Sequence, residues 1–176
     1  GSSRSLLDQC LSACLHGVGV MRCGQGRTGT QNRRPDRWVH GGEARREQLG
    51  YDYSSGVWQF EGYGYVPSGT TGVCIMQVFG ASDGASTFML RVYDGALRYY
   101  DRQLVEDNIY DRWFRLNVVH DVKASTLTVY IDGEQKLRVH GRGGHSYFFK
   151  FGVYAQNHDS SRMESRWKQV RILKKH

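Results

Sequence analysis

The sequence predicts an all-β protein, an antiparallel β-sandwich or β-jelly roll with an irregular N-terminal arm. After about Leu49, the 176-residue chain becomes a series of short runs of β-branched and aromatic residues separated by Gly, Asp, Asn and Ser. Many of these runs alternate apolar and polar residues, which is the period of a strand with one buried face. Because such strands are apolar on one face only, two sheets must pack together to bury those faces.

Nine strands are expected in order along the chain, each a run of this composition between two turn signals. They cover residues 56–65, 72–79, 86–93, 96–101, 112–120, 125–132, 135–140, 147–156 and 165–174. Asp94-Gly95 and Asp132-Gly133 each separate two of these runs, and an Asp-Gly pair readily adopts the positive φ angles of a tight primed turn. We therefore expect a β-hairpin at both positions.

The N-terminal part of the chain has a different character. Residues 25–47 show neither a helical nor a strand period, so we expect loop there, while residues 6–22 could form one short helix. The expected organisation is an irregular Arg- and Gly-rich arm over residues 1–42, followed by a jelly-roll domain over residues 43–176. That second length is typical of a single domain.

Composition and charge exclude several classes of protein. With 39% hydrophobic and 12% aromatic residues the chain can form a core, and it contains no apolar run of the length that crosses a bilayer. The net charge is +7, and a large part of it comes from the first 40 residues. Such a charge attracts polyanions without selecting among them. The basic C-terminal segment SRWKQVRILKKH lacks any nucleic-acid recognition pattern, so no specific nucleic-acid partner is expected.

The alternation of side chains along a strand predicts which residues share a face. Gln77 should share its face with Val73, Ile75 and Phe79. Lys150, Tyr154 and Gln156 should lie together on a second polar face, and Arg91 on a third. If these faces belong to one sheet, its surface carries amide, cationic and aromatic groups suited to carboxylates and sugars. For any one of these residues, a solvent-facing position in an ordinary strand is the alternative.

Neither a metal nor a cofactor is expected. Gly24, Gly26 and Gly29 match the spacing of a dinucleotide-binding loop, but no βαβ unit surrounds them. Cys10, Cys14, His16 and Cys23 do not have the spacing of a zinc site.

Three short motifs resemble those of the alginate lyase type polysaccharide lyases of family 7. FFKFGVYAQ at 148–156 resembles their Y-F-K-x-G-x-Y-x-Q signature, MQVFG at 76–80 resembles their Q-[IV]-H strand, and Arg45-Arg46-Glu47 could stand for their R-x-E motif. Longer stretches, among them NIYDRWFRLNVVHDV and MESRWKQVRILKK, are closer still to the plant citrate-binding proteins, which share that fold. The resemblance covers about residues 43–174.

The resemblance implies a concave sheet that holds an acidic ligand. Lyases of this type eliminate across a uronate, which needs a neutralised carboxylate, a base and an acid. By motif, Arg45 and Gln77 would neutralise the carboxylate and Tyr154 would be the acid, or both acid and base. The usual base is the His of the Q-[IV]-H motif, and this chain has Phe79 there. A phenyl ring cannot accept a proton.

The expected function is therefore binding of an anionic ligand, a citrate-like acid or an acidic polysaccharide, without catalysis. The alternative is an active lyase working through Tyr154, with His145 or His16 as a replacement base. A third possibility is a structural or assembly protein, a homo-oligomer joined through a sheet edge. Plant relatives enter the secretory pathway, which implies the vacuole or the extracellular space. The expected ligand-binding residues are Arg45, Gln77, Arg91, Lys150, Tyr154 and Gln156.

Overall fold

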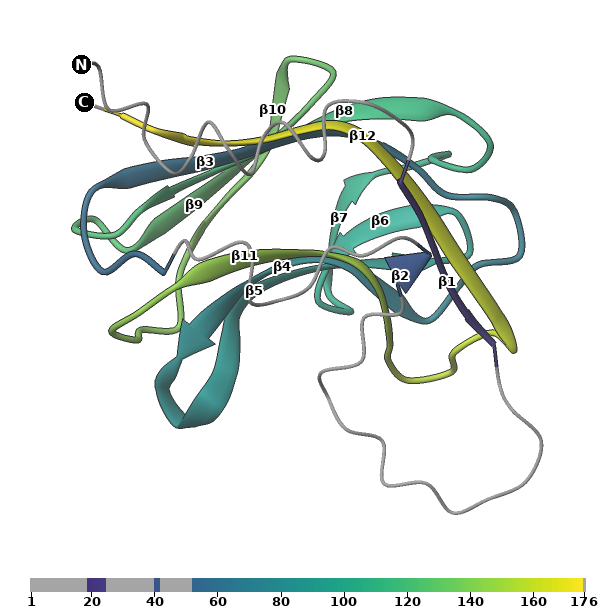
Figure 1. Cartoon of the computed structure of the whole chain (residues 1–176), viewed down its shortest axis with the longest axis horizontal. Coiled ribbons are helices and arrows are strands. Elements are labelled where there is room, and N and C mark those ends of the chain that lie inside the picture. The colour runs from purple at the N-terminus through teal and green to yellow at the C-terminus, as the bar shows by residue number, and fades with distance from the viewer. Residues whose placement is uncertain (1–18, 25–39, 42–51, 176) are drawn as a thin grey trace.

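The computed structural model describes residues 19–24, 40–41 and 52–175, and these residues form two antiparallel sheets packed face to face (Figure 1). One sheet has seven strands in the order β10-β9-β8-β3-β12-β1-β2, and the other has five in the order β11-β4-β5-β6-β7. This confirms the predicted all-β sandwich. The strands are β1 (Gly19–Gly24), β2 (His40–Gly41), β3 (Val57–Tyr65), β4 (Val73–Ala81), β5 (Ala85–Tyr93), β6 (Ala96–Tyr99), β7 (Gln103–Glu106), β8 (Trp113–Asp121), β9 (Thr126–Ile131), β10 (Glu134–His140), β11 (Phe148–Ala155) and β12 (Arg162–Lys174).

Both predicted hairpins are confirmed. Asp94 and Gly95 have φ angles of 49° and 83°, and Asp132 and Gly133 have 51° and 85°. Two successive residues with positive φ turn the chain tightly enough to join β5 to β6 and β9 to β10. The short strand β7 was not predicted, because four residues with only Val105 buried are too few to show a period.

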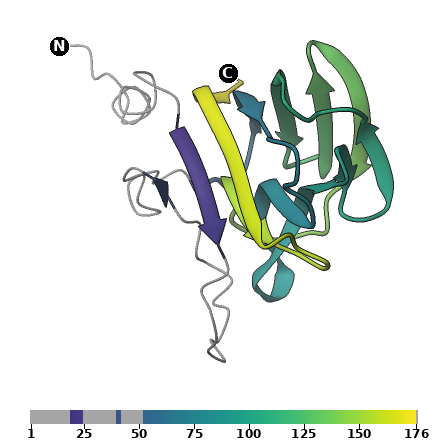
Figure 2. The same cartoon turned by 90° about the vertical axis from the view of Figure 1, so that its right-hand side faces the viewer.

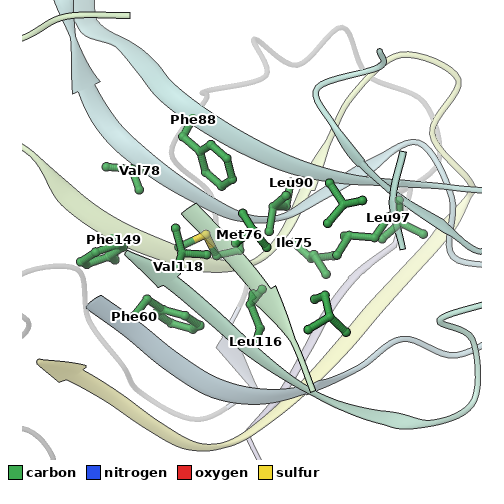
Figure 3. Close-up of a cluster of buried hydrophobic side chains, with 14 of the residues drawn as sticks. Phe60, Ile75, Met76, Val78, Phe88, Leu90, Leu97, Leu116, Val118 and Phe149 are labelled. Atoms are coloured by element: carbon green, nitrogen blue, oxygen red, sulfur yellow. The ribbon is translucent and has the colours of Figure 1, made fainter. Parts of the chain in front are cut away.

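The core lies between the two sheets and is built from the apolar face of each strand. Side chains from the two sheets point toward one another in Figure 3. Burying one such side chain fully contributes about 1.5–3 kcal/mol, so this layer is the main source of stability. Fully buried members include Phe60, Ile75, Met76, Val78, Phe88, Leu90, Leu97, Leu116 and Val118.

Two stretches of the N-terminal segment are strands, not irregular chain. Gly19–Gly24 pairs along β12 (Figure 2), and His40–Gly41 pairs with β1. β12 is 13 residues long, so its edge offers backbone donors and acceptors that a second strand can satisfy. This corrects the expectation of an irregular arm for those residues, and of helix for residues 19–22. The rest of the predicted arm lies outside the described residues.

The predicted faces are correct for β5 and β11 and wrong for the first half of β4. Val73 and Ile75 were expected to share the face of Gln77, but both are buried in the core. The register of β4 shifts between Cys74 and Met76, because a β-bulge there inserts one extra residue opposite β5. The bulge brings Cys74 onto the face of Gln77. The part of the chain that the structure describes has no helix long and apolar enough to cross a membrane.

Candidate functional site

The candidate site is the face of the five-stranded sheet that is turned away from the core. On this face Lys150 of β11 lies directly opposite Gln77 of β4, which lies opposite Met89 of β5. Residues paired in this way project from the same side of a sheet. The adjacent row projects into the core and consists of Phe149, Val78 and Phe88.

A second row crosses the same face closer to the other end of β4. Tyr154 lies opposite Cys74, Cys74 opposite Arg91, and Arg91 opposite Arg98. Four of the predicted ligand-binding residues therefore meet on one face, although they come from three strands, β4, β5 and β11. These four are Gln77, Arg91, Lys150 and Tyr154.

Lys150 is held by two aromatic rings. Its side chain is only 9% exposed, and its Nζ lies 4.2 Å from the ring centre of Phe79 and 5.1 Å from that of Phe148. The two rings lie opposite each other across the strands, with their centres 5.2 Å apart. A cation this close to a ring face is attracted by about 0.5–2 kcal/mol per contact. The ring at the position of the family's histidine therefore fixes a positive charge and cannot accept a proton.

Gln77 is oriented by a neighbouring hydroxyl group. The Ser86 hydroxyl donates a hydrogen bond of 2.6 Å to Oε1 of Gln77, whose side chain is 3% exposed. Because the amide oxygen is turned to Ser86, Nε2 is the end of the amide that can donate to a carboxylate. Ser86 is a site residue that the sequence did not predict, since a serine at a strand end carries no signal of its own.

The remaining predicted residues lie elsewhere or outside the described chain. Gln156 follows β11, and its Nε2 donates to the backbone oxygen of Ala155 at 2.9 Å, so this side chain is engaged with its own segment. His145 is exposed on the connection between β10 and β11. Arg45 and His16 lie outside the described residues. Within the described residues, no three His, Cys, Asp or Glu side chains are grouped so that they could hold a metal ion.

Cys74, which also lies on this face, has an unreactive thiol. Its thiol is fully buried, lies 3.2 Å from the backbone oxygen of Met76, and is free of any disulfide. Burial raises the pKa of the Cys74 thiol to about 12. The thiolate is the nucleophilic form, so Cys74 fills space between Arg91 and Tyr154 and is not a nucleophile.

Comparison with known proteins agrees with this architecture. A model of the alginate lyase family matches residues 42–174. A citrate-binding protein of Hevea brasiliensis is 52% identical over 126 residues, which are 71% of this chain and 53% of that protein, so the chain spans about half the length of this curated relative.

Solved structures of alginate lyases share the fold at low identity. The enzyme of Corynebacterium sp. superposes with a TM-score of 0.56 and 16% identity over 71% of this chain and 62% of its own. The family 7 lyase of Zobellia galactanivorans gives 0.55 and 17% over 71% and 65%. The motif resemblance is confirmed, and the chain belongs to the alginate lyase family.

Proposed function

We propose that the face carrying Gln77, Lys150 and Tyr154 binds a carboxylate of an anionic ligand and does not cleave it. The ligand is a citrate-like acid or a uronate-containing glycan. The observation that carries the proposal is Lys150, a largely buried lysine whose ammonium group lies over the ring of Phe79 and whose strand position pairs with Gln77. The name of the Hevea relative supports an acid as ligand.

The three side chains supply complementary interactions. Lys150 offers charge, the Nε2 group of Gln77 offers a fixed donor, and the phenol of Tyr154 offers a third donor from the next row of the same face. Hydrogen bonds to a charged group contribute about 1.5–3 kcal/mol each. Burial lowers the local dielectric constant and strengthens each of these interactions.

Cleavage lacks its usual base on this face. β-Elimination needs a group that takes the proton next to the carboxylate, and Phe79 cannot do so. One observation favours the alternative of an active lyase, which is that Tyr154 lies on the same face as Gln77 and Lys150. In that alternative Tyr154 would have to act as both base and acid.

Calorimetric titration with citrate and with alginate oligomers tests the proposal. Wild-type protein should bind at least one of these acids, and Lys150→Met should weaken that binding about 10-fold or more, the equivalent of one charged hydrogen bond. Lys175→Met is the matched control, because Lys175 is an exposed lysine beyond the end of β12 on the other sheet. It should bind like the wild type.

The same oligomers test for catalysis through the ultraviolet absorbance of an unsaturated uronate product. We expect no increase in absorbance. An increase with wild-type protein but not with Tyr154→Phe would establish the lyase alternative. Absence of heat with every acid tested would remove the binding proposal itself.

A further inference from the structure

Two arginine side chains share one tyrosine ring beside the proposed ligand site. The guanidinium carbon of Arg91 lies 5.1 Å from the ring centre of Tyr100, and that of Arg142 lies 5.7 Å from it. Arg91 belongs to β5, Tyr100 follows β6, and Arg142 lies in the connection between β10 and β11. The β5–β6 hairpin and a connection much later in the chain therefore bring two positive charges to one ring.

No carboxylate of the described residues forms an ion pair with either arginine. Within the part of the chain that the structure describes, no Asp or Glu oxygen lies within 4 Å of a guanidinium nitrogen of Arg91 or Arg142, whereas Arg112, Arg162, Arg166 and Arg171 each have such a partner. Arg98, opposite Arg91, adds a third cation, and its Nη1 donates to the backbone oxygen of Arg102.

Arg91 also has a buried donor without an acceptor. Its Nε is inaccessible to solvent and makes no hydrogen bond to the described residues, and its Nη2 lies 3.5 Å from the thioether sulfur of Met89. A buried donor without a partner costs about 1–3 kcal/mol, more for a charged group, so native structures rarely retain one without a reason. A bound oxyanion would supply acceptors to those guanidinium nitrogens of Arg91 that solvent reaches, and not to the inaccessible Nε.

Hydrogen bonds connect this cluster to the carboxylate site. The Tyr100 hydroxyl donates to the backbone oxygen of Ser86 at 2.9 Å, and the Ser86 hydroxyl donates to Gln77. The backbone N–H of Arg142 donates to Thr87 Oγ1 at 2.6 Å, which fixes the connection against β5. Neighbouring strands are about 4.8 Å apart, so the strands of Arg91 and Lys150, two spacings apart, are separated by about 10 Å.

We infer that Arg91 and Arg142 form a second carboxylate site, so that the ligand of this protein is a polycarboxylate. One carboxylate lies at Lys150 and Gln77, and another lies between the two guanidinium groups. Two guanidinium groups can donate several N–H groups to one carboxylate, which a single ammonium cannot match. The inference rests on the proposed function and specifies its ligand. Polycarboxylic acids of small size and uronate oligomers share this chemistry.

The test compares ligands with one and with several carboxylates. Glucuronate, citrate and a uronate trimer are titrated at one ionic strength into wild-type protein, Arg91→Gln, Arg142→Gln and the double variant. The polycarboxylate that binds wild-type protein should lose about 10-fold in affinity in each single variant, while glucuronate should change less than 2-fold. The matched control is Arg138→Gln, an exposed arginine on β10 of the other sheet.

The outcomes separate this inference from the proposed function. Unchanged polycarboxylate binding in the double variant, with Lys150→Met still weakening it, overturns the second site and leaves the first. Equal losses for glucuronate and for the polycarboxylates also overturn it, because Arg91 and Arg142 would then serve the same carboxylate as Lys150. A loss confined to the trimer identifies the ligand as a uronate oligomer, and a loss confined to citrate identifies a small acid. No binding of any acid to wild-type protein rejects the proposed function itself.

Discussion

His120 is a histidine with a structural role in the fold. It is 1% exposed, lies on the inner side of β8, and its Nδ1 is 2.9 Å from the hydroxyl of Tyr53. The ring of Tyr147 stands edge-on to the imidazole, with ring centres 4.7 Å apart. Burial lowers the pKa of His120 to about 4. The imidazole is therefore neutral near pH 7 and shares a hydrogen bond with the hydroxyl of Tyr53, between the sheets and not on the ligand face.

This pair makes stability depend on pH. Because the folded pKa of His120 lies below the ordinary 6.5, only the unfolded chain takes up the proton as the pH falls from about 6.5 to about 4. We expect the contribution of His120 to the free energy of unfolding to be complete above pH 6.5 and to fall by about 2 kcal/mol between pH 7 and pH 5.

Urea unfolding at pH 7 and pH 5 measures this change. His120→Leu should remove most of the difference between the two pH values. Tyr53→Phe, which keeps the histidine and loses its hydrogen bond, should retain the difference at a lower overall stability. If the free energy of unfolding fell equally between pH 7 and pH 5 in His120→Leu and in wild-type protein, the pH dependence would come from other groups.

At the scale of the strand, regular alternation could be predicted and its interruptions could not. In β5 and β11 the period of two holds, so Arg91, Lys150 and Tyr154 lie on the predicted side. In β4 the bulge after Cys74 adds one residue, so the side chains before it face the opposite side from the one that simple alternation predicts. The bulge depends on pairing with β5 and not on a local sequence preference, so the sequence did not reveal it. Arg142 lies in a connection without a period, so nothing in the sequence placed it beside Tyr100.

The end of β4 depends on a close contact between two backbones. A Cβ atom on Gly80 would lie 1.9 Å from the backbone oxygen of Ser146, and one on Gly144 would lie 1.9 Å from the backbone oxygen of Gly80. Both glycines have positive φ, 125° and 133°. Phe79 and Phe148, which hold Lys150, lie beside this contact.

Gly80→Ala should therefore destabilise the protein by about 3 kcal/mol or more, since backbone atoms must separate and a strained φ is added. Gly69→Ala is the control, because Gly69 has a φ of 90° with no atom within 4 Å of the added Cβ. It should cost about 1 kcal/mol, the penalty of the left-handed conformation alone. Urea unfolding curves give both values, and equal costs would show that the contact of the two backbones is not tight.

At the scale of the whole molecule, the sandwich gathers residues that the chain keeps far apart. The composition and turn signals were sufficient to predict two packed sheets, because those signals are local. The pairing of Lys150 with Gln77 and of Arg91 with Cys74 is a property of strand order and register, which local sequence does not determine. Family motifs supplied Gln77 and Tyr154, while Ser86, Tyr100 and Arg142 emerged only from the packing.

The position of charge, more than its total, should govern binding. The net charge of +7 attracts anions from all directions, but at 0.15 M salt the Debye length is about 8 Å, and stacked sheets are about 10 Å apart. Two double variants separate these effects. The first, Arg138→Gln/Lys175→Gln, removes two charges from the side of the seven-stranded sheet. The second, Arg91→Gln/Arg142→Gln, removes two charges beside the ligand face. At 0.15 M salt the first variant should bind a polycarboxylate within about 2-fold of wild type, and the second should lose about 10-fold or more. At 0.01 M salt, where the Debye length is about 30 Å, the first variant should show a slower association rate. Equal weakening of the two variants at 0.15 M salt would mean that net charge, and not the arginine pair, holds the ligand.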